Sequence, residues 1–190
     1  LQRKLVAQAA CDVIARGGME GASVRAIARE LDCTIGMLPR YFKNKEDLLL
    51  TALRTAAERS LRGAGRTLER SENASMLGYL LAALPTTPEK SLYWRVLIAY
   101  LGAAIGNPKL AQAYREIDEG YRGWLLADLR QRQASGKIAP GVDLEQAADA
   151  LDVFTDGLGL HAVLEPERYP PERLEAMLAD YLEKVLGAQA

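Results

Sequence analysis

Two short helix-forming segments with a polar break between them, within residues 23–42, constrain the fold of this chain more than any other feature. The apolar residues of the first segment recur at the spacing of one helix face, at Val24, Ile27, Ala28 and Leu31. Those of the second segment do the same, at Ile35, Leu38 and Phe42. In the break, Thr34 stands where a side-chain hydroxyl caps the first amides of a helix. The pattern predicts a helix, a tight turn and a second helix, which together form a helix-turn-helix.

The second segment leaves a polar and aromatic face outside its apolar stripe. Gly36, Met37, Arg40 and Tyr41 occupy that face. In a helix-turn-helix the second helix enters the major groove of DNA, where an arginine can bond guanine and a glycine permits close approach. The pattern therefore predicts a DNA-reading helix. On the first segment, Arg25 and Arg29 are more typical of a solvated face than of base readers.

The charge of the chain is unevenly distributed, although its net charge is only −1. Residues 1–62 contain 11 Lys and Arg against 7 Asp and Glu, a net charge of +4. Residues 63–190 contain 13 against 18, a net charge of −5. A basic N-terminal part joined to an acidic remainder is typical of a protein that presents one end to phosphates.

Composition indicates a globular protein with a substantial core, because 49% of its 190 residues are hydrophobic. No apolar run approaches the roughly 20 residues that a membrane span needs, and no signal-peptide pattern opens the chain. The sequence begins at Leu1 rather than at Met, so we expect a short tail ahead of it. Cys11 and Cys33 have no metal or redox spacing, and we expect buried thiols in a cytoplasmic protein.

Helical periodicity runs along the chain and strand alternation is absent, so the predicted fold class is all-α. We predict an N-terminal three-helix domain with the helix-turn-helix at residues 1–45 and a helical bundle at residues 46–190. The polar, glycine-containing residues 63–75 are the expected joint between the basic and acidic parts.

Helix boundaries are marked by capping residues and breakers. A first helix is expected from about Leu1 to Arg16, with Gly17-Gly18 as its stop. Asn44 is expected to cap the helix after the helix-turn-helix. Later start signals are Thr87-Pro88, Asn107-Pro108, Asp143 with Gln146, and Pro170-Pro171.

The last two helices have wide apolar stripes, as in an up-and-down bundle. The stripe of the first of them is formed by Ala147, Leu151, Phe154, Thr155, Leu158 and Ala162. The stripe of the second is formed by Leu174, Met177, Leu178, Tyr181, Leu182 and Val185.

The N-terminal third resembles the DNA-binding domain of TetR-family transcriptional regulators. The matching order is Ser23-Val-Arg-Ala-Ile-Ala, then Thr34-Ile-Gly-Met-Leu-Pro-Arg-Tyr-Phe, then Lys45-Glu-Asp-Leu-Leu. More loosely, the acidic remainder is similar to the BetI-like type of C-terminal domain. One departure is Pro39, which removes a backbone donor and crowds the carbonyl of Ile35. The recognition helix is therefore expected to contain a tight or irregular turn.

The resemblance implies a dimeric repressor that binds a palindromic double-stranded DNA operator. Phosphate contacts are expected from Ser23, Tyr41 and Lys45, and groove contacts from Thr34, Gly36, Met37 and Arg40. The full set of candidate DNA-binding residues is Ser23, Val24, Arg25, Thr34, Ile35, Gly36, Met37, Pro39, Arg40, Tyr41 and Lys45. The last two helices are the expected surface of the homodimer.

The resemblance also implies a small-molecule inducer, of unknown identity, held by the bundle. The candidate pocket residues are Tyr79, Trp94, Tyr100, Tyr114, Trp124, Phe154 and His161. For any single aromatic residue, ordinary core packing is the stronger interpretation. His161 has no Cys or His at metal spacing, so neither a metal nor another cofactor is expected.

Two other classes of function stay open. A helical-bundle enzyme would need a nucleophile–base pair or Glu-x-x-His spacing. An enzyme is disfavoured because the chain has one histidine and no such spacing. A helical interaction protein that no longer reads DNA is the other alternative, and Pro39 is its best support.

Overall fold

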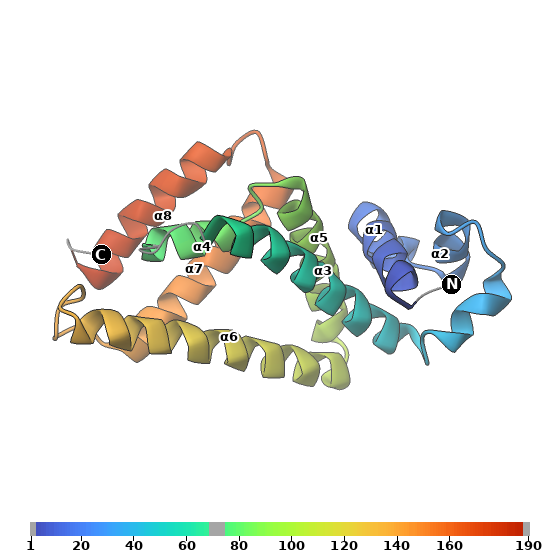
Figure 1. Ribbon diagram of the computed structural model, residues 1–190, viewed down its shortest axis with the longest axis horizontal. Helices are drawn as coiled ribbons and strands as arrows, with labels where there is room; N and C mark the ends of the chain where they lie inside the picture. Colours follow the sequence, from blue (N-terminus) through green and yellow to red (C-terminus); the bar gives the residue numbers. More distant parts are fainter. Residues whose placement is uncertain (1–2, 69–74, 188–190) are drawn as a thin grey trace. The chain divides into compact units, whose positions relative to one another are not determined.

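The computed structural model describes residues 3–68 and 75–187, and over these ranges every regular element is a helix. Along the chain the elements are α1 Arg3–Gly21, α2 Val24–Glu30, the 3-10 helix η1 Ile35–Arg40, α3 Lys45–Leu68, α4 Met76–Ala83, α5 Pro88–Ile105, α6 Pro108–Ala134, α7 Leu144–Leu164 and α8 Pro171–Leu186 (Figure 1). The predicted all-α fold class is confirmed. Within the described ranges, no helix has the length and apolar character needed to cross a membrane.

The helices form two compact units, each built from two separate stretches of chain. The first, called here the head unit, comprises Leu1–Gly63 and Thr87–Tyr114. The second, the body unit, comprises Ala64–Thr86 and Arg115–Ala190. Helix α5 and the first turns of α6 thus pack with the N-terminal helices. The boundary after residue 45, predicted between a DNA-binding part and a ligand-binding and dimerisation part, does not coincide with a boundary of these units, and it stays a prediction.

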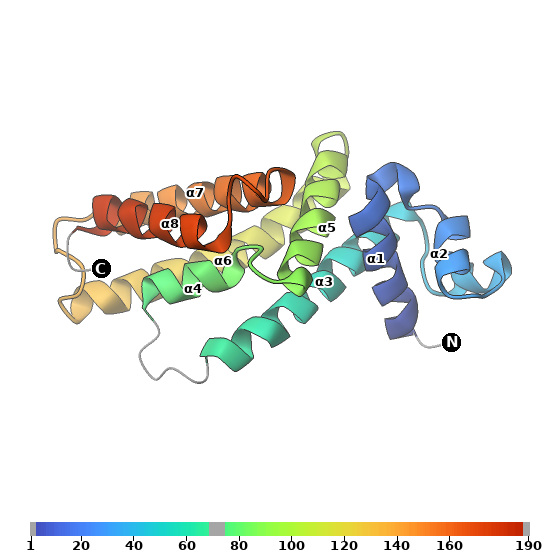
Figure 2. The same ribbon diagram turned by 90° about the horizontal axis from the view of Figure 1, so that it is seen from above.

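In the head unit, α1 packs against α5 and α2, and α2 packs against η1 (Figure 2). The predicted inner face of the first helix is buried throughout, at Val6, Ala9, Ala10, Val13 and Ile14. The Sγ of Cys11 donates a buried hydrogen bond to the carbonyl oxygen of Ala52 at 3.0 Å, which joins α1 to α3. Burial raises the pKa of Cys11 to about 12. Cys11 is therefore a neutral structural thiol, as predicted, whereas Cys33 is only half-buried.

The predicted stop of the first helix lies at the right place, but the chain resumes a helical path after it. Gly18 has φ 60° and ψ −160°, outside helical values, and this kink interrupts α1 before it ends at Gly21. Glycine adopts such a left-handed φ without steric cost because it lacks a Cβ.

Capping chemistry accounts for most of the helix starts. Asn44 Oδ1 accepts from the Asp47 amide at 2.8 Å, and Thr87 Oγ1 accepts from the Lys90 amide at 3.4 Å, as predicted. The side chain of Asp143 accepts from the amides of Glu145 and Gln146. The predicted joint at residues 63–75 includes the boundary between the two units after Gly63, but its first residues are helical, because α3 continues to Leu68. Residues 69–74 of that joint lie outside the described residues.

The core of the body unit includes the contacts of α8 with both α4 and α7. Helix α8 buries a leucine on every turn, at Leu174, Leu178, Leu182 and Leu186. Facing residues of α7 are buried as predicted, at Ala147, Leu151, Thr155, Leu158 and Ala162. Phe154 of α7 stacks on Tyr181 of α8, with ring centroids 3.8 Å apart. The two predicted stripes therefore do pack, α7 on α8.

Asp32 has a left-handed backbone, with φ 48°, in the turn between α2 and η1. A β-branched side chain is strained at such a φ, whereas glycine is not. We expect Asp32→Val to lower the free energy of unfolding by about 1–2 kcal/mol, which corresponds to a melting temperature roughly 2–8 °C lower. Asp32→Gly is the matched control and is expected to melt no lower than the native protein. Equal melting temperatures for the two variants would contradict the inference that a β-branched side chain is strained at position 32.

Candidate nucleic-acid interface

Helix α2 begins with a side-chain cap and exposes one of its faces. Ser23 Oγ accepts from the Ala26 amide at 3.1 Å, as expected of an N-cap. Ile27 and Ala28 are buried against the rest of the head unit. Val24, which was predicted both on the apolar stripe and among the DNA-binding residues, is 44% exposed. It therefore lies on the surface and not in the core.

Thr34 does not cap the second helix with its hydroxyl, contrary to the sequence-based expectation. Its backbone carbonyl instead accepts from the Met37 amide at 3.1 Å. That bond spans three residues, which is the pattern of a 3-10 helix rather than an α-helix. The Thr34 side chain is left exposed.

The second helix of the motif, η1, is a six-residue 3-10 helix with Pro39 inside it. Proline has no amide hydrogen, so Pro39 cannot donate the α-helical bond to the carbonyl of Ile35, and its ring crowds that carbonyl. The tighter 3-10 turn avoids this crowding. The expected tight turn is therefore present in this helix, and Pro39 as its cause stays a prediction.

A single buried side chain anchors η1. Leu38 is 2% exposed, whereas Ile35 is 48% exposed and Phe42 is half-buried. The predicted apolar stripe is therefore buried at Leu38 and only half-buried at Phe42, whereas Ile35, which was also predicted to bind DNA, is exposed. A 3-10 helix places residues three apart on one face, so Ile35 lies one turn from Leu38, roughly 6 Å along the axis, and is exposed at the start of η1.

The candidate DNA-binding residues lie on the two adjacent elements α2 and η1 and at the start of α3. All of them are exposed except Tyr41, which is half-buried: Ser23, Val24, Arg25, Thr34, Ile35, Gly36, Met37, Pro39, Arg40 and Lys45. At Gly36 a Cβ would meet no atom within 4 Å, so this position offers open space for a close approach. The surface combines cations with apolar and hydroxyl groups, which suits phosphates and base edges.

The loop after η1 is held by reciprocal bonds around the start of α3. The carboxylate of Asp47 accepts from the Lys43 amide at 2.9 Å, while Asn44 accepts from the Asp47 amide. Lys45 is the first residue of α3 and lies between these groups. The capping bonds therefore hold the backbone from which the Lys45 side chain extends.

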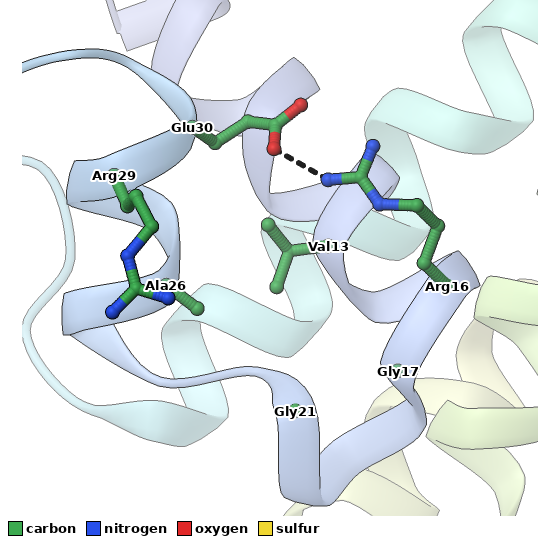
Figure 3. A pocket seen from close by; sticks show the side chains of 7 residues that line it. All are labelled: Val13, Arg16, Gly17, Gly21, Ala26, Arg29 and Glu30. Atoms are coloured by element: carbon green, nitrogen blue, oxygen red, sulfur yellow. Dashed lines mark hydrogen bonds and ion pairs between the residues drawn. The ribbon is translucent and has the colours of Figure 1, made fainter.

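A pocket of about 350 Å³ lies between the end of α1 and α2 (Figure 3). An ion pair between Arg16 and Glu30 joins the two helices beside it. The other lining residues are Val13, Gly17, Gly21, Ala26 and Arg29. Sequence reasoning missed this pocket, because its residues share no motif and meet only through the packing of α1 on α2.

The candidate pocket aromatics are divided between the two units. Trp94, Tyr100 and Tyr114 belong to the head unit, where Trp94 and Tyr100 are buried and Tyr114 is half-buried. The hydroxyl of Tyr100 donates to the Leu110 carbonyl oxygen at 2.9 Å. Tyr100 is therefore a satisfied core residue.

Within the body unit, the other four candidates do not share one cluster. Tyr79 and Trp124 make an edge contact with ring centroids 5.5 Å apart, and Tyr121, which was not among the candidates, stacks on Trp124 at 6.0 Å. Phe154 stacks on Tyr181 instead. His161 is exposed and lies 3.4 Å from the carboxylate of Glu165.

Two aspartates of α7 have perturbed protonation. Burial, reinforced by neighbouring carboxylates that include Asp118, raises the pKa values of Asp152 and Asp156 to about 6. Nearby, Arg122 donates hydrogen bonds to Asp149 and Glu145 and lowers the pKa of Asp149. The body unit thus holds two carboxylates that are costly to ionise near neutral pH.

These raised pKa values make the stability of the body unit depend on pH. When folding raises the pKa of a carboxyl group, its protonated form stabilises the folded state. This contribution is complete at pH values below the pKa of the unfolded state, and it is lost as the pH rises through about 6, the pKa in the folded state. We expect Asp156→Asn to raise the melting temperature at about pH 7.5 by roughly 2–4 °C, and to give little gain near pH 4.

Asp149→Asn is the matched control for that experiment, because the pKa of Asp149 is lowered by Arg122. Its contribution therefore has the opposite pH dependence. The Asp149 carboxylate stabilises the folded state at neutral pH, and this stabilisation is lost on acidification. We expect this variant to melt at or below the native temperature at about pH 7.5. Parallel behaviour of the two variants would contradict the assignment.

Comparison with known proteins connects this surface to a family. Residues 7–52 match the model of bacterial regulatory proteins of the tetR family, and residues 73–187 match the model of the BetI-type transcriptional repressor C-terminal domain. The HTH-type transcriptional regulator PksA of Bacillus subtilis is 31% identical over 97% of this chain and 89% of its own length.

Solved structures agree in fold over almost the whole chain. A transcriptional regulator from Rhodococcus sp. Rha1 is 30% identical, with a TM-score of 0.84 over 100% of this chain and 99% of its own. A putative regulator from Saccharomonospora viridis, solved in complex with choline, is 24% identical, with a TM-score of 0.83 over 95% of each chain. The chain therefore belongs to the TetR family of bacterial regulatory proteins, with a BetI-type C-terminal domain, and it is a DNA-binding transcriptional regulator.

Proposed function

We propose that this regulator is a repressor that binds a palindromic operator as a homodimer in the cytoplasm, and that a small molecule bound by its C-terminal part releases it. In this proposal residues 1–45 bind DNA, and residues 46–190 bind the ligand and the second copy. The observation that supports it best is the exposed surface formed by α2, η1 and the start of α3, with Arg40 and Lys45 among its exposed cations.

The short helix η1 is the proposed reader of the major groove. Six residues of 3-10 helix span about 12 Å, comparable to the width of the groove. Arg40 would bond guanine, and Thr34 or Met37 would contact a thymine methyl group. Ser23, Tyr41 and Lys45 would contact phosphates, which position the protein and make its affinity depend on salt.

An exposed apolar face of α7 supports the proposed homodimer. Val153, Leu160 and Leu164 are 73%, 37% and 64% exposed, and their spacing places them along one side of the helix. Gly157 lies between them, and a Cβ there would meet no atom within 4 Å. A second copy related by two-fold symmetry would bury these residues and match a two-fold symmetric operator.

The proposed effector is a small molecule held by the body unit. The contacting rings of Tyr79, Tyr121 and Trp124 offer flat apolar faces, and Asp152 and Asp156 supply charge. The choline complex of the Saccharomonospora viridis protein supports the capacity of this fold to take a small ligand. Ligand would weaken operator binding by favouring a second conformation of the dimer.

Titration of the protein onto the DNA upstream of its own gene tests the proposal. We expect a shifted complex whose affinity exceeds that for a scrambled duplex of equal length by 10³-fold or more, as for specific regulators. The logarithm of the affinity should fall linearly with the logarithm of the salt concentration. Binding without sequence preference, or no binding at low salt, would count against DNA reading and favour the interaction protein.

A further inference from the structure

The side chain of Asn107 makes hydrogen bonds in two directions. Its Oδ1 accepts from the backbone amides of Lys109 at 3.0 Å and Leu110 at 3.3 Å, which caps helix α6. Its Nδ2 donates to Oε1 of Glu46 at 2.7 Å. One residue therefore caps α6 and at the same time binds the first turn of α3.

Both partners are anchored inside the head unit. The buried hydroxyl of Tyr100 donates to the carbonyl oxygen of Leu110, so α5 is tied to the first turn of α6. On the other side, Glu46 is the second residue of α3, where Asn44 and Asp47 hold the backbone through the capping bonds described above. The bond of Asn107 thus connects a fixed part of the head unit to the start of α3.

The start of α3 follows closely on the recognition helix. Arg40 ends η1, and only the loop at residues 41–44 separates it from Lys45. Leu38 is the one fully buried residue of η1, so few packing contacts of its own orient this helix. Its direction therefore depends on where its flanking segments are held as well as on its packing against α2.

We propose that Asn107 is a positioning residue for operator binding, and that its hydrogen bond to Glu46 holds the start of α3 and thereby orients η1. The proposal rests on the proposed DNA-binding function. A purely structural role, in which Asn107 only caps α6, is the competing explanation. The two explanations predict different operator affinities for a variant that keeps the cap of α6 but lacks the bond to Glu46.

Two variants separate the two explanations. One is the single variant Asn107→Ser, and the other is the double variant that combines Asn107→Asp with Glu46→Gln. Serine and aspartate are N-caps as good as asparagine. Serine adds no charge and is too short to reach Glu46. In the double variant the amide of the introduced glutamine donates to the introduced aspartate, so the bond is reversed, and the net charge equals that of the native protein.

We expect Asn107→Ser to weaken operator binding about tenfold, as for the loss of a hydrogen bond to a charged group. The double variant is expected within about twofold of the native affinity. Asn107→Ser should also melt a few degrees lower, because the bond to Glu46 contributes to stability, and the double variant should recover the native melting temperature. Amide hydrogen exchange of the free protein at residues 35–47 should quicken in Asn107→Ser and recover in the double variant.

Native affinity in Asn107→Ser, or no recovery in the double variant, would overturn the positioning role. If the native protein itself bound no operator, the proposed function would fail, and operator affinity would no longer test the positioning contact. Exchange at residues 35–47 still distinguishes that case, since unchanged exchange in Asn107→Ser contradicts the positioning contact whether or not DNA is bound.

Discussion

Replacing Leu38 with alanine is expected to lower the free energy of unfolding by about 2–5 kcal/mol, a large part of the stability of an ordinary domain. Leu38 is 2% exposed and is the one buried residue of η1. Truncating it removes apolar contacts and leaves a cavity that the short helix cannot fill. Urea unfolding monitored by far-UV circular dichroism, with the midpoint and slope compared to the native protein, measures the effect.

Ile35→Ala is the matched control for Leu38→Ala. Both residues lie in η1 and on the same predicted apolar stripe, but Ile35 is 48% exposed. We therefore expect a loss of no more than about 0.5 kcal/mol for Ile35→Ala, as for ordinary surface substitutions. Losses of similar size in the two variants would contradict the packing of η1 described here.

The second large effect is expected from Arg40→Ala in operator binding. An arginine that bonds guanine contributes about 1–3 kcal/mol of discrimination, so the variant should lose roughly 5-fold to 150-fold in affinity for the operator. Its affinity for a scrambled duplex should change far less. Competition titrations of the two duplexes, at one salt concentration, give the ratio directly.

Lys45→Ala should behave differently, because its proposed contact is with phosphate. We expect weaker binding to both duplexes and a salt dependence whose logarithmic slope is smaller by about one. Arg130→Ala serves as the control, since Arg130 is exposed in the body unit and pairs with Glu145. If Arg40→Ala kept the native preference for the operator, Arg40 would not be the base-reading residue, and the preference would have to come from other residues of the surface.

The sequence predicted the elements well wherever local chemistry decides the outcome. Periodic apolar residues predicted the buried faces of α1 and α7, and the side chains of Asn44, Thr87 and Asp143 cap their helices as expected. Such patterns succeed because a helix hydrogen-bonds within itself and exposes its apolar face at a fixed period.

The errors of sequence reasoning lie where the actual helix geometry or the packing of other segments overrides the pattern expected of a regular α-helix. Thr34 has the chemistry of a cap, but the 3-10 geometry imposed near Pro39 gives its carbonyl the first bond instead. Ile35 has the spacing of the apolar stripe, yet it is 48% exposed. The predicted pocket aromatics are spread over two units because each ring packs against the neighbours that its own helix meets.

Local periodicity, capping residues and the charge difference between the two parts of the chain were sufficient to predict an all-helical protein with a basic helix-turn-helix. Tertiary packing alone decided that α5 and the start of α6 join the head unit, and that Asn107 meets Glu46 across 61 positions of sequence. The reason is physical. Helical hydrogen bonds and caps connect residues within a turn of one another, whereas the choice of packing partner depends on surfaces that exist only once the helices have formed.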